Sequence, residues 1–169
     1  MTRVMAAHIQ DIPAWLNLAT QVEHLFGPLV QDPNFRHALR KNIKRGTAFC
    51  VRENDGPPGT PLMGGLLFSP HPPKYIIGWL AVDNQHRRQG IGHTLVNHVF
   101  QLVQPPAEII VTTFGPKDPT GKPARQFYKK MGFRPAEMSG DGTCTPIRQI
   151  YCRLFHRDIT QGDLCDQTH

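Results

Sequence analysis

The chain has 169 residues, of which 39% are hydrophobic, and its formal net charge at pH 7 is +6. This length predicts one domain that is large enough to bury a core without disulfide or metal staples. No apolar run approaches the ~18 residues of a membrane span, and the first residues have no signal-peptide core, so we expect a cytoplasmic protein with no membrane partner.

Cysteine spacing and the distribution of charge indicate which metals, cofactors and partners to expect. The four cysteines, at positions 50, 144, 152 and 165, are widely spaced and include no Cys-x-x-Cys pair, so we expect reduced thiols and no metal. A basic surplus is typical of nucleic-acid binders, but it also helps to attract a polyanionic cofactor. Because the basic residues are scattered along the chain, we favour a cofactor and expect no nucleic-acid partner.

Apolar periodicity predicts alternating strands and helices in the N-terminal part. A short strand is expected at 4–8, and spacings close to a helical face predict helices over 11–25 and 34–45. Strand-like runs at 47–52 and 62–69 are separated by the turn residues Asn-Asp-Gly-Pro-Pro-Gly. They predict an antiparallel hairpin with an extended loop.

The central part of the chain contains the clearest strand. The continuous apolar run at 75–82 predicts a strand buried on both faces. Gly78 within it indicates a bulge or a close backbone approach. A helix is expected from Gly90 to the Pro-Pro pair at 105–106, and the next strand at 107–114.

The C-terminal part predicts one more helix and two strands. Apolar residues at helical spacing follow Pro123, and Gly132 is the expected C′ residue that closes this helix. The last strands are expected at 133–138 and 147–154. We expect residues 1–155 to form the single domain and residues 156–169 to be a polar tail that frays.

The most informative segment runs from Trp79 to Gly92. An apolar strand ends, a polar and basic turn follows, and two glycines open a helix. A helix N-terminus presents free backbone N–H groups and favours negative charge, so this turn is expected to bind a phosphate. A Rossmann fingerprint is excluded because its third glycine would be Leu95, and a Walker A loop is excluded because His93-Thr94 follows Gly92.

Two blocks resemble a known family. The triplet Arg-x-x-Gly-x-Gly at 87–92 and the block Ala-x-x-Phe-Tyr-x-x-x-Gly-Phe at 124–133 are similar to motifs of the GCN5-related N-acetyltransferases (GNAT). This resemblance implies an α+β fold with a mixed, mostly antiparallel central sheet flanked by helices, the acyl-CoA N-acyltransferase fold. It also implies direct transfer of an acetyl group from acetyl-CoA to a primary amine of a small molecule or peptide.

The resemblance also implies which residues bind acetyl-CoA. The N–H groups from Arg88 to His93 would hold the pyrophosphate, with Arg87 and Arg88 adding charge-assisted contacts. The main chain of the strand before the loop would pair with the pantetheine amides. The expected cofactor-binding residues are Leu80, Val82, Arg87, Arg88, Gln89, Gly90, Ile91, Gly92, His93 and Phe127.

Tyr128 is the catalytic residue that the resemblance implies. In the family this tyrosine commonly acts as the general acid that protonates the departing thiolate, and a phenol with a pKa near ~10 can supply that proton. The alternative is an aromatic residue at core spacing. Phe127 beside it is expected to pack or to contact the adenine and pantetheine side.

Three features depart from the family pattern or stay open. Gly121 stands where many relatives have an asparagine that contacts pantetheine. The strand at 75–82 contains no carboxylate, so the general base stays unassigned. Gly78 suggests the strand irregularity that an oxyanion-stabilising N–H group would need. The candidate bases are Asp83, His71, Glu23 and His24.

The acceptor and the partners also stay open. By the resemblance, the acceptor lies between the first two helices and the last hairpin, where Glu23, Asp118 and Asp141 could attract a cation. A homodimer through exposed edge strands is another possibility. The alternative function is a non-catalytic acyl-CoA-binding sensor or interaction module, and a small basic nucleic-acid binder is a third reading that no motif supports.

Overall fold

The structure is a computed structural model, and it describes residues 2–139 and 148–156. Its seven-stranded sheet has the order β1-β2-β3-β4-β5-β7-β6. Neighbouring strands are antiparallel except β4 and β5, which run parallel, so the expected mixed, mostly antiparallel sheet is confirmed. The strands are β1 Met5–Ala6, β2 Ala48–Arg52, β3 Leu62–His71, β4 Lys74–Val82, β5 Ala107–Phe114, β6 Arg134–Ser139 and β7 Arg148–Phe155.

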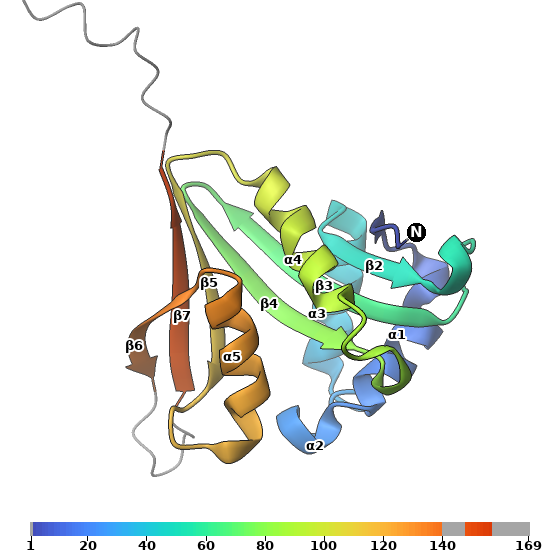
Figure 1. The fold of residues 1–169 in the computed structure, drawn as a ribbon. Helices are drawn as coiled ribbons and strands as arrows, with labels where there is room; N and C mark the ends of the chain where they lie inside the picture. Colours follow the sequence, from blue (N-terminus) through green and yellow to red (C-terminus); the bar gives the residue numbers. More distant parts are fainter. Residues whose placement is uncertain (1, 140–147, 157–169) are drawn as a thin grey trace, which may run out of the picture.

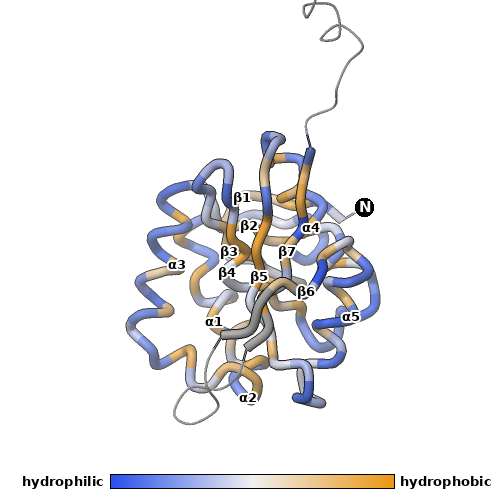
Figure 2. The backbone as a smooth tube through the Cα atoms, turned by 90° about the vertical axis from the view of Figure 1, so that its left-hand side faces the viewer, coloured by the Kyte–Doolittle hydropathy of each residue, from blue (hydrophilic) through white to orange (hydrophobic). Residues whose placement is uncertain are grey.

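Helices lie on both sides of the sheet (Figures 1 and 2). Helices α1 and α3 pack on one side, and α4 and α5 pack on the other. The α-helices are α1 Ile12–Thr20, α2 Glu23–Phe26, α3 Pro33–Arg45, α4 Ile91–Leu102 and α5 Lys122–Lys130, and the short 3-10 turns are η1 Ile9–Asp11, η2 Glu53–Asp55, η3 Asn84–His86 and η4 Pro119–Gly121. None of the helices in the described ranges has the length and apolar content to span a bilayer.

Each helix layer has its own core. Leu95 of α4 and Tyr128 of α5 pack against the sheet with the buried residues Ile77 and Ile109. On the opposite side, Trp15 of α1 packs with Leu39 of α3, Phe35 and Trp79. Figure 2 shows that the hydrophobic residues concentrate in the strands between the two layers, while the outer helix faces are hydrophilic.

Local backbone chemistry sets the end of α5. Gly132 has φ +88°, its N–H donates to Lys129 O at 3.0 Å, and the N–H of Phe133 donates to Tyr128 O at 2.9 Å. These two bonds form a Schellman motif, in which a left-handed glycine lets the chain satisfy the last carbonyls of the helix. The expectation that Gly132 closes this helix is therefore confirmed.

Three expectations about the elements differ from the structure. The helix expected over 11–25 is two helices, because α1 ends at Thr20 and α2 starts at Glu23. The strand at 75–82 is not buried on both faces: Tyr75 and Ile77 are buried, but Ile76 is 37% exposed. The reason is that α1 covers the end of β4 near Trp79, whereas the described elements leave that side of its beginning open. The short strand expected at 4–8 also reduces to Met5–Ala6.

Several expectations concern residues outside the described ranges. Cys144, Cys165 and Asp141 lie there, as do the turn at 140–147 and the tail at 157–169. Cys50 and Cys152 are free thiols.

Candidate functional site

The strands β4 and β5 diverge in the middle of the sheet. They pair only from Lys74 and Glu108 to Ile77 and Val111, after which each strand continues without the other. Figure 1 shows β4 turning away from β5 beyond this point. Among the described residues, the last part of β4 therefore has no partner strand on its β5 side, and its main-chain groups on that side are available to a ligand.

A bulge marks the point where the strands part. On β3, Leu67 and Phe68 are consecutive, yet their partners on β4 are Trp79 and Ile77, so Gly78 is the extra residue. This confirms the expected irregularity at Gly78. A bulge bends the strand and increases its twist, which is consistent with the divergence of β4 from β5.

The turn between β4 and α4 presents a row of free amides. Within the described parts of the chain, none of the main-chain N–H groups of residues 87–93 donates a hydrogen bond to a protein acceptor. Arg88 has φ +62° and Gly90 has φ +80°, and both arginine side chains of this turn are exposed. Positive φ is rare for residues with a side chain and often marks a functional turn. This arrangement suits an anion.

The second sequence block, at 124–133, lies beside this turn through the ring of Phe127. A Cβ on Gly92 would lie 3.4 Å from the Phe127 ring and 3.6 Å from Val82. The start of α4, the end of β4 and helix α5 therefore meet here, although they are far apart in the sequence. At Gly90, no atom lies within 4 Å of a built Cβ, so glycine is required there by φ and not by space.

Tyr128 lies in the core beside Phe127. It is 6% exposed, and its ring packs at a centroid distance of 5.1 Å from Phe127 and 5.4 Å from Phe133. The hydroxyl makes no hydrogen bond with any described residue. Burial raises the pKa of Tyr128 above its usual value. A phenol is protonated at neutral pH even without this shift, so Tyr128 can act as a proton donor and not as a base.

Gly121 has a steric reason to be glycine. A Cβ at this position would overlap the Phe114 side chain and would lie 2.7 Å from Nη1 of Arg125. Arg125 Nη1 in turn donates to Gly115 O at 2.8 Å, which fastens α5 to the end of β5. The departure from the family asparagine thus accompanies a close approach of η4 to β5.

The four candidate bases lie in different settings. His71 pairs with Lys74 at the opposite end of β4 from Val82, roughly 26 Å away at about 3.3 Å per residue. Glu23 accepts a hydrogen bond from Val30 N at 2.9 Å, and His24 is exposed. His71 is therefore far from the other three, whereas Glu23 and His24 follow Gln21, which bonds to Asp83. Asp83 itself is occupied by the network described next.

A hydrogen-bond network that the sequence did not predict fixes the start of the turn. Gln21, between α1 and α2, donates from Nε2 to Asp83 Oδ1 at 2.7 Å and accepts from Asn84 N at 2.8 Å. The other oxygen of Asp83 accepts from Gln85 N at 3.0 Å and contacts His86 Nδ1 at 2.7 Å. Burial would raise the pKa of Asp83, but the hydrogen bonds from Gln21, His86 and Gln85 outweigh it and lower that pKa.

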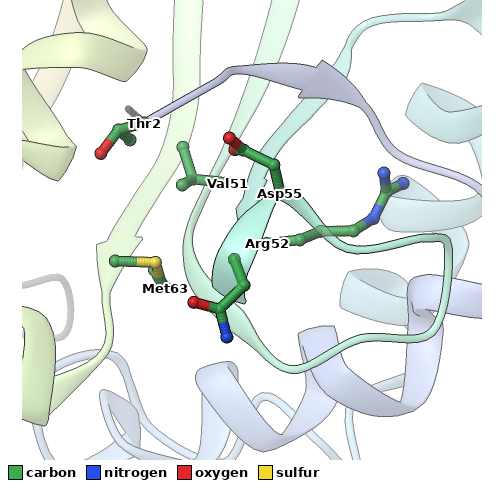
Figure 3. Close-up of a pocket in the computed structure, with 6 residues that line it drawn as sticks. Thr2, Val51, Arg52, Asp55 and Met63 are labelled. Carbon is green, nitrogen blue, oxygen red and sulfur yellow. The ribbon is translucent and has the colours of Figure 1, made fainter.

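Two surface hollows lie elsewhere. The larger, of about 380 Å³, is lined by Thr2, Val51, Arg52, Asn54, Asp55 and Met63. Figure 3 shows that the Arg52 guanidinium points away from Val51 and Met63, and it pairs instead with the buried Asp11. The second, of about 320 Å³, lies between residues 2–4 and α4. Neither hollow is lined by a predicted cofactor-binding residue.

Metal ligands do not gather in the described ranges. Across residues 2–139 and 148–156, no three His, Cys, Asp or Glu side chains come close enough together to hold a metal ion. The candidate site consists of the free end of β4, the turn at 87–93 and the side of α5 that faces this turn.

Comparison with known proteins agrees with this architecture. A family model described as "Acetyltransferase (GNAT) domain" matches residues 45–135. Among curated proteins, no sequence matches the chain significantly. Similar solved structures include paia N-acetyltransferase from Thermoplasma acidophilum in complex with coenzyme A, which is 13% identical with a TM-score of 0.72 over 92% of this chain and 99% of that one.

Two further structures are similar in fold. Ard1 from Thermoplasma volcanium is 16% identical, with a TM-score of 0.71 over 92% of this chain and 99% of that one. Arabidopsis thaliana Naa50 in complex with the bisubstrate analogue CoA-Ac-MVNAL is 18% identical, with a TM-score of 0.67 over 91% of this chain and 99% of that one.

Proposed function

The chain belongs to the GNAT acetyltransferase family, and from this premise we propose that it transfers an acetyl group from acetyl-CoA directly to a primary amine of a small molecule or peptide. As a member of this family it is an acetyl-CoA-dependent acyltransferase. One observation carries the proposal for the site: only residues 83–86 separate the unpaired end of β4 from the free N–H row at 87–93.

The donor would bind along these two features. The N–H groups of residues 87–93, with the side chains of Arg87 and Arg88, would hold the pyrophosphate. The main-chain groups of Leu80 and Val82 would pair with the pantetheine amides, because a strand edge without a partner is a template for an extended ligand. Phe127 would form the wall of this site opposite Val82, and the contact with Gly92 supports that position.

The reaction would form a C–N bond and break the C–S bond of the thioester. The amine attacks the carbonyl carbon and gives up a proton to a base that we leave unassigned. A main-chain N–H group near the Gly78 bulge would stabilise the oxyanion. Tyr128 would protonate the departing thiolate sulfur and then regain a proton from solvent. A phenol is protonated at neutral pH, as a proton donor must be.

The acceptor amine would approach between the first two helices and the last hairpin, as the resemblance implies, because the pantetheine arm would occupy the β5 side of the free end of β4. The peptide in the Naa50 bisubstrate analogue supports a peptide N-terminus as one acceptor class, and small-molecule amines are the other. A single domain over residues 1–155, a cytoplasmic location and a homodimer are further proposals that rest on the sequence alone.

Binding and catalysis can be tested separately. Acetyl-CoA at saturating concentration should raise the melting temperature, whereas an N-acetylcysteamine thioester, which lacks the pyrophosphate, should not. A screen of amines monitored by free-thiol release should then identify acceptors. Absence of any thermal shift with acetyl-CoA would overturn the proposed donor site. A shift without thiol release from any amine would favour the non-catalytic acyl-CoA-binding alternative.

A further inference from the structure

One short segment touches both diverging strands. Residues 21–26 contain the junction between α1 and α2. At one end, Gln21 bonds to Asp83 and Asn84 directly after β4. At the other end, the ring of Phe26 stacks on Phe114, the last residue of β5, at a centroid distance of 5.7 Å and an interplanar angle of 25°. This segment therefore bridges the two strands at the end where they are no longer paired.

The Gln21 carboxamide uses both of its ends. Its N–H group reaches a carboxylate and its oxygen accepts a main-chain N–H group, at 2.7 and 2.8 Å. The partners are 62 and 63 residues away in the sequence. A hydrogen bond to a charged group is stronger than a neutral one. The contact therefore ties the helix junction to Asp83 and Asn84. These two residues begin the turn at 83–93 that would bind the acetyl donor, which we call the donor turn.

Asp83 also restrains the next residues of the turn through its own hydrogen bonds. Its second oxygen bonds to Gln85 N and His86 Nδ1, so each oxygen of the carboxylate has its own partners. The N–H of His86 also donates to Asp83 O at 2.9 Å. The free N–H row begins with the next residue, Arg87. The position of that row consequently depends on a turn whose only long-range side-chain restraint among the described residues is Gln21.

We propose that Gln21 is a positioning residue for acetyl-CoA, which holds the donor turn in its binding conformation before the ligand arrives. The inference rests on the proposed function of residues 87–93. A loop that becomes ordered only on binding loses conformational entropy, and this loss weakens binding. A turn that is ordered in advance therefore binds its ligand more tightly. Without the Gln21 contact, we expect coenzyme A to bind about tenfold more weakly.

The first test measures coenzyme A affinity by calorimetry, without an acceptor or turnover. Gln21→Ala should raise the Kd about tenfold, and at saturating acetyl-CoA its kcat should stay within twofold of the wild type. Thr20→Ala is the matched control: within the part of the chain that the structure describes, Thr20 Oγ1 bonds only to Leu16 O in α1, so the Kd of this variant should not change. A wild-type Kd for Gln21→Ala would overturn the inference. Absence of binding by the wild-type chain would instead overturn the proposed function.

A swap of polarity tests whether Gln21 acts through Asp83. Gln21→Glu places two carboxylates side by side and should weaken binding more than Gln21→Ala. Adding Asp83→Asn to Gln21→Glu restores a donor and an acceptor, with the new amide facing the new carboxylate and its oxygen left for Gln85 N and His86. The double variant should recover to within about threefold of the wild-type Kd. A double variant no better than Gln21→Glu would overturn the inference, and the melting temperature of each unliganded variant checks its folding.

Discussion

The ring of Phe127 lies within contact distance of any side chain at Gly92, since a built Cβ on Gly92 is 3.4 Å from the ring carbons. This contact joins helix α5 to the start of α4, and so it joins the two sequence blocks that carry the family resemblance. A β-branched side chain at this position would push against both Phe127 and Val82 and would move the backbone of the N–H row.

We therefore expect Gly92→Val to weaken coenzyme A binding at least tenfold, as measured by calorimetry. The unliganded protein should lose only about 1–3 kcal/mol of stability, the usual range for overpacking. Gln101→Val, at an exposed position near the other end of α4, is the control for placing a β-branched residue in this helix. If both variants bound coenzyme A like the wild type, residues 87–93 would not be the pyrophosphate site.

Tyr128→Phe should separate catalysis from donor binding. Loss of a general acid typically lowers the rate by about 10²–10⁴-fold, and we expect kcat to fall in that range while the Kd for coenzyme A stays within twofold. The buried Tyr75 supplies the control, because Tyr75→Phe removes a phenol hydroxyl at the end of β4 that is opposite the donor turn and should leave kcat unchanged. Equal turnover for Tyr128→Phe and wild type would remove Tyr128 from the mechanism.

Gly121→Asn installs the residue that many relatives carry, and it should destabilise this chain. The new Cβ would overlap the Phe114 side chain, so η4 or the end of β5 must shift. We expect urea denaturation to report a loss of about 2 kcal/mol or more, within the range for overpacked sites. Gly78→Ala is the stability control, since the nearest atom to its Cβ, Leu67 O, would be 3.9 Å away. A Gly121→Asn variant as stable as wild type would show that this close approach is not rigid.

The buried pair of Asp11 and Arg52 should make stability depend on acidic pH. Asp11 is fully buried and accepts from Arg52 Nε at 2.9 Å and Nη2 at 2.6 Å, and from the main-chain N–H groups of Gly59 and His8. Burial would raise the pKa of Asp11, but these bonds outweigh it and hold that pKa below 3.8. A carboxyl with a lowered pKa stabilises the fold above its unfolded pKa, and that contribution is lost as the pH falls through the folded pKa.

Asp11→Asn should therefore cost about 3–5 kcal/mol at pH 7, because it leaves Arg52 buried without its counter-charge. The difference from wild type should shrink when urea denaturation is repeated below about pH 4. Asp32→Asn is the control. Asp32 caps α3 through Asn34 N, and asparagine caps a helix as well as aspartate does. A constant difference between Asp11→Asn and wild type at both pH values would contradict the assignment.

The parts of the fold that could be predicted are those determined by local chemistry. The strand at 107–114 has the predicted bounds, Gly132 closes its helix through its positive φ, and Gly78 forms a bulge. The break between α1 and α2 was not predictable, because apolar periodicity continues through it. Helix α1 ends at Thr20, and the side chain of the next residue, Gln21, bonds to Asp83 and Asn84 after β4. Tertiary contacts of this kind override periodicity, as they also do for the half-exposed strand β4.

The candidate site also has one part that could be predicted from the sequence and one part that could not. The glycines and arginines of the turn at 87–92 form a recognisable local motif. The network of Gln21, Asp83 and Asn84 has no such signal, because Gln21 is more than 60 residues from its two partners and a glutamine at a helix end is unremarkable in sequence. Only the fold brings them within hydrogen-bonding distance.

The bulge at Gly78 also limits how the length of β4 can change. It sets which side of the sheet each following residue faces, so that Trp79 packs against Trp15 and Phe35 while Val82 faces the opposite layer. Removing one residue here would invert every later position, since side chains alternate from one face to the other along a strand. A deletion or insertion of even one residue in this strand would consequently direct the following side chains into the wrong core.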